Sequence, residues 1–229
     1  PAEQWLDLYP ASAIQLPPNF LEKPPPGSIY NQGKPGEQYY RDSTYTKNYK
    51  NLPSGPPRTR EQIIDFMRAD YASISHLDAQ VGALMDELKA SGNYENTILV
   101  FLSDNGYHLG SHGLGNKITM HEESVRVPMF VHGPRLPRKG VHCPALVSSL
   151  DLFPTLLELA GGPAPKDLSG LSIVPLLSNP EGVLRPYVAS ECTGVGGKVG
   201  EGHRMVRTSQ WKYVLTDVNE EALFDETND

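Results

Sequence analysis

A long helical pattern that runs into a short apolar segment limits the possible folds of this chain more than any other feature. Residues 60–91 carry apolar side chains at intervals of three and four, which predicts an amphipathic helix. These positions are Ile63, Met67, Tyr71, Ile74, Leu77, Val81, Leu84 and Leu88. The unbroken apolar run 97–102 follows, and it is typical of a strand buried on both faces of a parallel sheet. A long helix that leads into a buried strand forms one α/β unit.

Three more regions carry recognisable secondary-structure patterns. Residues 127–131 predict a neighbouring strand, and residues 149–160 predict a helix with Pro154 in its first turn. Beyond residue 185 the chain changes to short extended segments, which predict a small antiparallel sheet. These segments are residues 187–189, 204–207 and 211–215.

The first quarter of the chain has a different composition. Eleven of the 21 prolines lie within residues 1–57, and proline neither continues a helix nor donates to a central strand. We expect a long irregular arm here, with a disordered linker as the alternative. The predicted organisation is a Pro-rich arm at 1–59, part of an α/β domain at 60–184, and the start of a small antiparallel subdomain at 185–229. The glycine-rich segment 191–203 is predicted to be a mobile surface loop.

Composition and charge exclude several classes of protein. The 229 residues carry 20 Lys and Arg against 27 Asp and Glu, a formal charge of −7, without a dense basic block. This balance argues against a nucleic-acid binder. No apolar run approaches the ~20 residues of a membrane-spanning helix. The two cysteines, Cys143 and Cys192, are too few for a disulfide scaffold and leave the redox compartment open.

The residues best suited to chemistry follow the apolar run at 97–102, where ligands bind in open α/β sheets. Asp104 and Asn105 offer the hard oxygen atoms that Ca²⁺ and Mg²⁺ take. Lys117 offers an ammonium group that can stabilise negative charge in a transition state. The alternative is an ordinary Asp-Asn-Gly turn, because Asn and Gly tolerate positive φ. In that case His108 and His112 are loop histidines and the lysine is a solvated charge.

Several segments in a fixed order resemble the arylsulfatase-type sulfatases of the alkaline phosphatase superfamily. The strongest likeness is to the block of that family that carries metal ligands and a lysine. It comprises residues 103–106, 109–114, 116–117 and 122–128. Weaker likenesses, at 71–82, 149–157, 204–213 and 221–225, extend it over most of residues 70–229. Ser111 departs from the pattern, since many relatives carry Glu there.

This resemblance implies a partial alkaline-phosphatase-like α/β fold, with a mixed sheet flanked by helices and a small C-terminal antiparallel α+β subdomain. It implies that Asp104 and Asn105 bind Ca²⁺, or less often Mg²⁺. It also implies that Lys117 is catalytic and contacts the transferring sulfate. His112 is placed near the substrate, with a supporting role in the loop as the alternative.

Four other polar residues are weaker candidates for the site or are interpreted as structural. His108 is a weaker candidate for the site, and Arg126 is expected to form an ion pair that orders the loop. His76 and Asp78 lie on the predicted helix at 60–91 and are interpreted as structural.

The nucleophile of the resembling family is a formylglycine made from a cysteine or serine in a Cys-x-Pro-x-Arg segment. Neither Cys143 nor Cys192 has that setting. The resemblance therefore places the nucleophile and the remaining metal ligands upstream, in an N-terminal remainder of the same polypeptide. We expect the isolated chain to be inactive, to bind metal weakly and to expose a sheet edge.

The activity expected of the full-length protein is hydrolysis of a sulfate ester of a sugar or another small molecule. One alternative is a phosphoester or phosphonate hydrolase of the same superfamily. Another is a non-catalytic structural or binding domain. The family resemblance implies a periplasmic, secreted or lysosomal location. It is the only basis for this expectation, because no signal region is visible in this sequence.

Overall fold

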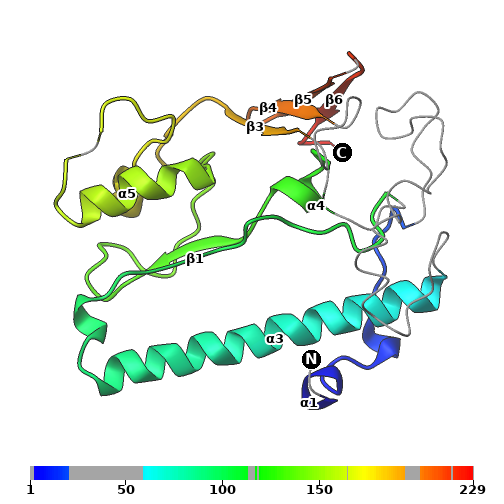
Figure 1. The fold of residues 1–229 in the computed structure, drawn as a ribbon, viewed down its shortest axis with the longest axis horizontal. Coiled ribbons are helices and arrows are strands. Elements are labelled where there is room, and N and C mark those ends of the chain that lie inside the picture. Colours follow the sequence, from blue (N-terminus) through cyan, green and yellow to red (C-terminus); the bar gives the residue numbers. More distant parts are fainter. Residues whose placement is uncertain are drawn as a thin grey trace. The chain divides into compact units, whose positions relative to one another are not determined.

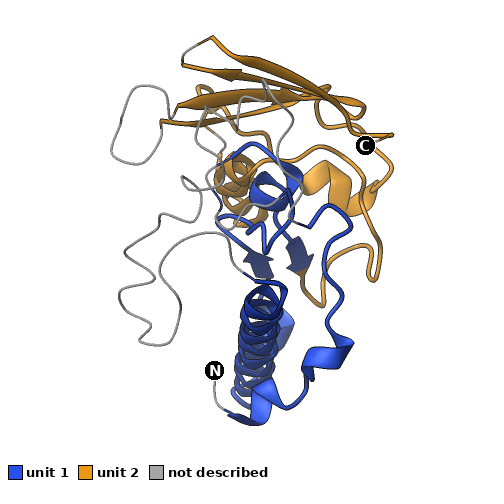
Figure 2. Cartoon of the chain, turned by 90° about the vertical axis from the view of Figure 1, so that its right-hand side faces the viewer, with its two compact units in different colours: residues 1–131 blue, residues 132–229 orange. Residues whose placement is uncertain are grey.

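The structure is a computed structural model that describes residues 3–20, 59–112, 117, 119–163, 165–193, 202–217 and 219–228. The chain forms two compact units, residues 1–131 and 132–229 (Figure 2). Most of the predicted Pro-rich arm and most of the predicted loop at 191–203 lie outside the described residues. The predicted division of the chain at residues 59 and 184 stays a prediction.

The predicted long helix is confirmed as α3, Arg60–Ala90, which runs the length of the first unit (Figure 1). Thr59 begins it with a capping box: its side chain accepts from the Gln62 backbone N–H, and the Gln62 side chain accepts from the Thr59 N–H at 2.9 Å. This exchange satisfies two backbone donors that the first turn would leave unpaired. Along the apolar stripe only the first part is buried, at Ile63 and Met67, whereas Leu84 is 53% exposed.

Residues 3–20 differ from the irregular arm expected there. They form α1 (Glu3–Leu6) and the 3₁₀ helix η1 (Ala11–Ala13), and both pack against α3. Ile14 joins Ile63 and Met67 in a small apolar core. The Tyr9 hydroxyl lies 2.6 Å from the Ser75 hydroxyl on α3. The proline-rich composition of this segment does not prevent Ile14 from being buried.

The two predicted strands of the α/β unit are present and pair with each other. β1 is Leu99–Leu102 and β2 is Met129–His132, with the Phe101 and Phe130 rings stacked at 5.1 Å. β2 begins two residues later than predicted, after Pro128, which has no N–H for the ladder. The expectation of complete burial for residues 97–102 is wrong for this chain. Each residue of β1 is half-buried, because β2 is its one neighbouring strand among the described residues.

The second unit begins with helices around one buried carboxylate. η3 (Ser149–Asp151) continues into α5 (Leu152–Leu159), which confirms the predicted helix, and α6 (Val174–Ser178) was not predicted. Asp151 is fully buried and accepts hydrogen bonds from the backbone N–H groups of Ser148 and Leu171. It also forms an ion pair with Arg185. These contacts satisfy a charge that would otherwise be costly to bury.

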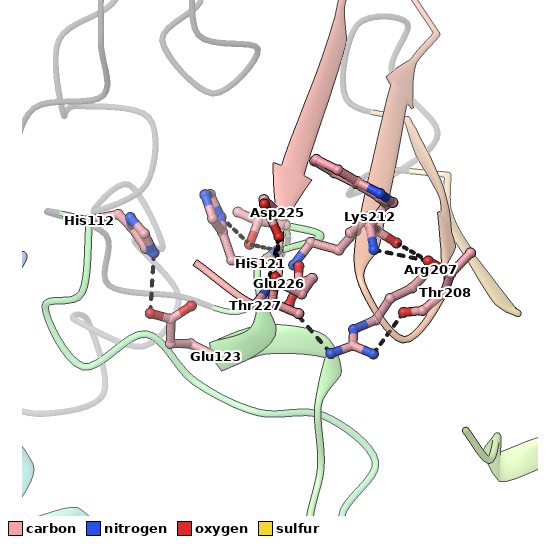
Figure 3. A network of polar contacts seen from close by, with 11 residues as sticks. His112, His121, Glu123, Arg207, Thr208, Lys212, Asp225, Glu226 and Thr227 are labelled. Carbon is pink, nitrogen blue, oxygen red and sulfur yellow. Dashed lines mark hydrogen bonds and ion pairs between the residues drawn. The ribbon is translucent and has the colours of Figure 1, made fainter. Parts of the chain in front are cut away.

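The predicted antiparallel sheet is confirmed, with four strands in sequential order. The strands are β3 (Val188–Cys192), β4 (His203–Arg207), β5 (Trp211–Thr216) and β6 (Glu221–Asp225). Lys212 is buried on this sheet, 2.7 Å from Glu226, which also pairs with Arg207 at 3.4 Å (Figure 3). Among the described residues, no helix combines the length and apolarity that a membrane span requires.

Candidate active site

The candidate site begins where β1 ends. The Ser103 hydroxyl donates to the Asn105 carbonyl oxygen at 2.7 Å, and the Asn105 side-chain amide donates to the Gly106 carbonyl oxygen at 2.9 Å. The Gly106 N–H donates to the Ser124 carbonyl oxygen at 2.8 Å. Ser124 belongs to α4 (Glu122–Val125), a four-residue helix that was not predicted. The turn that carries Asp104 and Asn105 is therefore fixed to α4 through its backbone.

Lys117 forms a hydrogen bond with the Asn105 side chain. Lys117 Nζ donates to Asn105 Oδ1 at 2.8 Å, although twelve residues separate them. The Ser124 hydroxyl donates to the Lys117 carbonyl oxygen, so α4 holds this residue as well. Asp104 is exposed, and its carboxylate forms no hydrogen bond or ion pair with the described part of the chain.

These groups fit a divalent cation only in part. Among the described residues nothing pairs with the Asp104 carboxylate, and Asn105 Oδ1 already accepts a hydrogen bond from the Lys117 ammonium. Both are hard oxygen donors of the kind that Ca²⁺ and Mg²⁺ prefer. No group of three or more His, Cys, Asp or Glu side chains suited to a metal occurs among the described residues. Two oxygen donors fall short of the ~6–8 that Ca²⁺ takes, so a complete site needs ligands from elsewhere.

His112 lies in an unusual backbone conformation and is held by its neighbours. Its φ is +56°, in the left-handed region that few residues other than glycine adopt. Its Nε2 lies 3.2 Å from Glu123 Oε1 on α4 (Figure 3). The Asn19 side-chain nitrogen lies 3.3 Å from each ring nitrogen. The His121 ring stacks on it, with the two centroids 4.3 Å apart.

Two further histidines, His108 and His121, lie next to His112, and Thr119 contacts both of them. His108 is buried, with its Nε2 2.8 Å from the Thr119 hydroxyl. The same hydroxyl lies 3.1 Å from His121 Nδ1 and accepts from the His121 backbone N–H. His108 Nδ1 is buried and has no hydrogen-bond partner among the described residues. Three imidazoles and one carboxylate, Glu123, therefore form a single cluster in the first unit.

Two groups of this cluster have strongly shifted pKa values. Burial disfavours the charged imidazole and lowers the pKa of His108 to about 4, although the Glu123 charge opposes this. Burial alone would raise the pKa of the Glu123 carboxyl. The hydrogen bond and positive charge of His112, with a backbone hydrogen bond, outweigh burial and lower this pKa to about 2. At neutral pH His108 is therefore neutral and Glu123 is ionised.

These shifts predict a protein that loses stability in mild acid. The unfolded chain protonates His108 near pH 6.5, whereas the folded chain does so only near pH 4. As pH falls through this window, the unfolded state binds the extra proton, and the free energy of unfolding decreases by about 3 kcal/mol. The contribution of Glu123 is present above pH 4.5 and is lost as pH falls from there towards 2.

Urea unfolding of the wild type and of His108→Gln at pH 7, 5.5 and 4.5 measures the effect. The substitution should flatten the pH dependence between pH 6.5 and 4. His76→Gln, on the exposed side of α3, should keep the wild-type slope. Parallel losses of stability in His108→Gln and the wild type would show that His108 is not the responsible group.

The other residues that sequence analysis singled out lie outside this cluster. Arg126 is exposed and forms no ion pair with any described residue, so the ion pair expected for it stays a prediction. His76 stacks on Trp5 at 5.7 Å, a structural contact between α1 and α3. Cys143 and Cys192 are free thiols, both in the second unit.

Sequence analysis missed Asn19, Thr119, His121 and Glu123 as members of the cluster. Asn19 lies in the proline-rich segment, where composition indicated an irregular arm. Glu123 lies in a helix too short to produce a periodic pattern. A hydrogen bond between side chains eleven or more residues apart leaves no local signal in a single sequence.

Comparison with known proteins identifies the family of this chain. Residues 22–162 match the sulfatase family, and residues 110–229 match the C-terminal region of N-sulphoglucosamine sulphohydrolase. A sulfatase of Formosa agariphila is 30% identical over 99% of this chain and 41% of its own length. Arylsulfatase K of Rattus norvegicus is 33% identical over 92% of this chain and 35% of its own length. The chain thus spans less than half of these relatives.

Solved structures share the fold. BT4656, in complex with its substrate D-glucosamine-2-N,6-O-disulfate, is 27% identical with a TM-score of 0.68 over 82% of this chain and 39% of that chain. A phosphonate monoester hydrolase of Silicibacter pomeroyi has a TM-score of 0.75 over 99% of this chain and 47% of that one, at 21% identity, and shows the fold alone. The predicted alkaline-phosphatase-like α/β fold class is confirmed. Within that class, the chain belongs to the sulfatase family.

Proposed function

We propose that the full-length protein carrying this chain hydrolyses a sulfate ester of a sugar or another small molecule. The observation that carries this proposal is the placement of the Lys117 ammonium on Asn105 Oδ1 at the end of β1, next in sequence to the exposed Asp104 carboxylate. An ammonium group in that place can bind a sulfate oxygen and stabilise charge that develops as the ester bond breaks. Lys117 is the catalytic and substrate-binding residue of the proposal.

Asp104 and Asn105 would hold a divalent cation, Ca²⁺ in the first instance and Mg²⁺ as the alternative. A bound cation supplies Lewis-acid stabilisation of negatively charged oxygens. The Asp104 carboxylate has no partner in the described part of the chain, and the Asn105 amide oxygen can offer its second lone pair. The remaining ligands would come from the N-terminal remainder of the same polypeptide, which we propose as a partner of this chain.

The nucleophile of the proposed reaction also lies outside this chain. A formylglycine supplies covalent catalysis in the resembling family, and neither Cys143 nor Cys192 stands in the required sequence. We therefore propose that the isolated chain is inactive. A sugar sulfate as substrate is supported by the substrate in the BT4656 structure. A periplasmic, secreted or lysosomal location belongs to the same proposal.

Metal removal from the full-length protein tests this function. Hydrolysis of D-glucosamine-2-N,6-O-disulfate and of an aryl sulfate should fall at least about 100-fold after dialysis against a chelator, because the Lewis acid is lost. Ca²⁺ should restore it. Asp104→Ala should weaken the response to added Ca²⁺, whereas Asp78→Ala on α3 should not.

An aryl phosphonate monoester, assayed in parallel, separates the two hydrolytic reactions. Preferential cleavage of the phosphonate would assign the chain to phosphoester chemistry. No hydrolysis of either substrate class by the metal-loaded protein would instead favour a non-catalytic domain.

A further inference from the structure

His112 occupies a constrained position in the candidate site. It ends a turn in which Leu109, Gly110 and His112 all have positive φ, at +49°, +100° and +56°. Two of these three residues are not glycine, so the turn is strained. Such strain persists only where the surrounding structure enforces it, and it is frequent at functional sites. The contacts that enforce it here therefore indicate what His112 does.

Both ring nitrogens of His112 lie close to protein side chains. Glu123 is ionised at neutral pH, so its carboxylate only accepts, and Nε2 of His112 must carry the proton of their 3.2 Å contact. On the other side of the ring, the Asn19 side-chain nitrogen lies 3.3 Å from Nδ1. Both ring nitrogens are engaged by protein groups. A substrate sulfate would have to displace one of them.

The two partners of His112 come from opposite sides of the turn. Asn19 belongs to the segment before α3, and the adjacent Phe20 pairs with Ser111 in an isolated β-bridge. Glu123 belongs to α4, whose Ser124 holds Gly106 through its carbonyl oxygen and Lys117 through its hydroxyl. His112 thus connects the N-terminal segment to the short helix that fixes both the Asn105 turn and Lys117.

We propose that His112 is a positioning residue rather than a substrate ligand: with Glu123 and Asn19 it clamps the strained turn 109–112 onto α4, and so fixes Asn105 and Lys117 in place. This inference rests on the proposed sulfate-ester hydrolysis, and it decides between the two roles that the sequence left open for His112. Side chains that orient other functional groups typically change activity by about 10–100-fold when removed.

The test is a double-mutant cycle in the full-length protein, with kcat and KM measured on a sulfate ester. His112→Ala and Glu123→Ala break the same contact from its two ends. Each should lower kcat by about 10–100-fold with little change in KM, and the double variant should be no worse than the poorer single variant. His112→Gln, which keeps an N–H for Glu123, should recover most of the lost kcat. Glu95→Ala, an exposed control in the same unit, should leave kcat unchanged.

Two results would overturn the proposal. One is a large rise in KM for His112→Ala with Glu123→Ala within about 2-fold of wild type, because that pattern belongs to a direct substrate ligand. The other is a double variant whose loss of kcat equals the product of the two single losses, which means that the residues act independently. A wild type without activity on sulfate esters contradicts the proposed function instead. In that case thermal midpoints of the same four proteins still report whether the two residues are coupled.

Discussion

Lys117→Ala should reduce kcat/KM of the full-length protein for a sulfate ester by about 100–1000-fold. The Lys117 ammonium donates to Asn105 Oδ1, and removing a single preorganised charge-stabilising donor typically costs this much. The side chain is exposed, so the substitution should leave the thermal midpoint nearly unchanged. Steady-state kinetics on an aryl sulfate, with the thermal midpoint measured in parallel, provides the readout.

Two controls define what the lysine contributes. Lys117→Arg keeps the positive charge but changes its geometry, so it should recover part of the activity. Lys166→Ala removes an exposed charge from the second unit and should have no effect. Activity of Lys117→Ala within about 3-fold of wild type would remove the lysine from the mechanism. It would also favour the reading of this segment as a turn kept for folding.

The elements predicted correctly from sequence are those with a repeating local pattern. α3 shows the 3–4 spacing of apolar residues along its length, and β4 and β5 are short extended segments bounded by turn residues. The same local logic placed Asp104 and Asn105 at the end of β1. The pairing of Lys117 with Asn105 is different, because no spacing rule joins residues that lie twelve positions apart. The family resemblance implied that both residues belong to one site, but it did not predict this hydrogen bond.

Contacts between distant segments could not be predicted from the sequence. Burial of Ile14 against α3 depends on where the proline-rich segment folds back, and composition says nothing of that. The half-burial of β1 depends on which strands lie beside it, whereas its apolar sequence is equally suited to complete burial. The attachment of His112 to Glu123 depends on α4, whose four residues carry no helical signature of their own.

Gly106→Ala should destabilise the first unit by about 3 kcal/mol, because a methyl group has no room at this position. An added Cβ would lie 2.0 Å from the Glu123 carbonyl oxygen and 2.9 Å from its carbon, and both are backbone atoms that cannot rotate away. Relief of this overlap requires α4 to move off the turn, which breaks the hydrogen bond from Gly106 N–H to Ser124. Loss of that contact also frees Asn105 and Lys117, so activity should fall with stability.

Gly82→Ala is the matched control for this substitution, and its expected effect has the opposite sign. Gly82 lies within α3, where an added Cβ meets nothing within 4 Å. Replacement of an exposed helical glycine by alanine should raise the free energy of unfolding by up to about 1 kcal/mol. Urea unfolding of the two variants thus compares the same chemical change at a crowded turn and on an open helix face. Equal stability of Gly106→Ala and wild type would mean that α4 does not contact the turn at backbone distance, and the positioning role inferred for His112 and Glu123 would lose its structural basis.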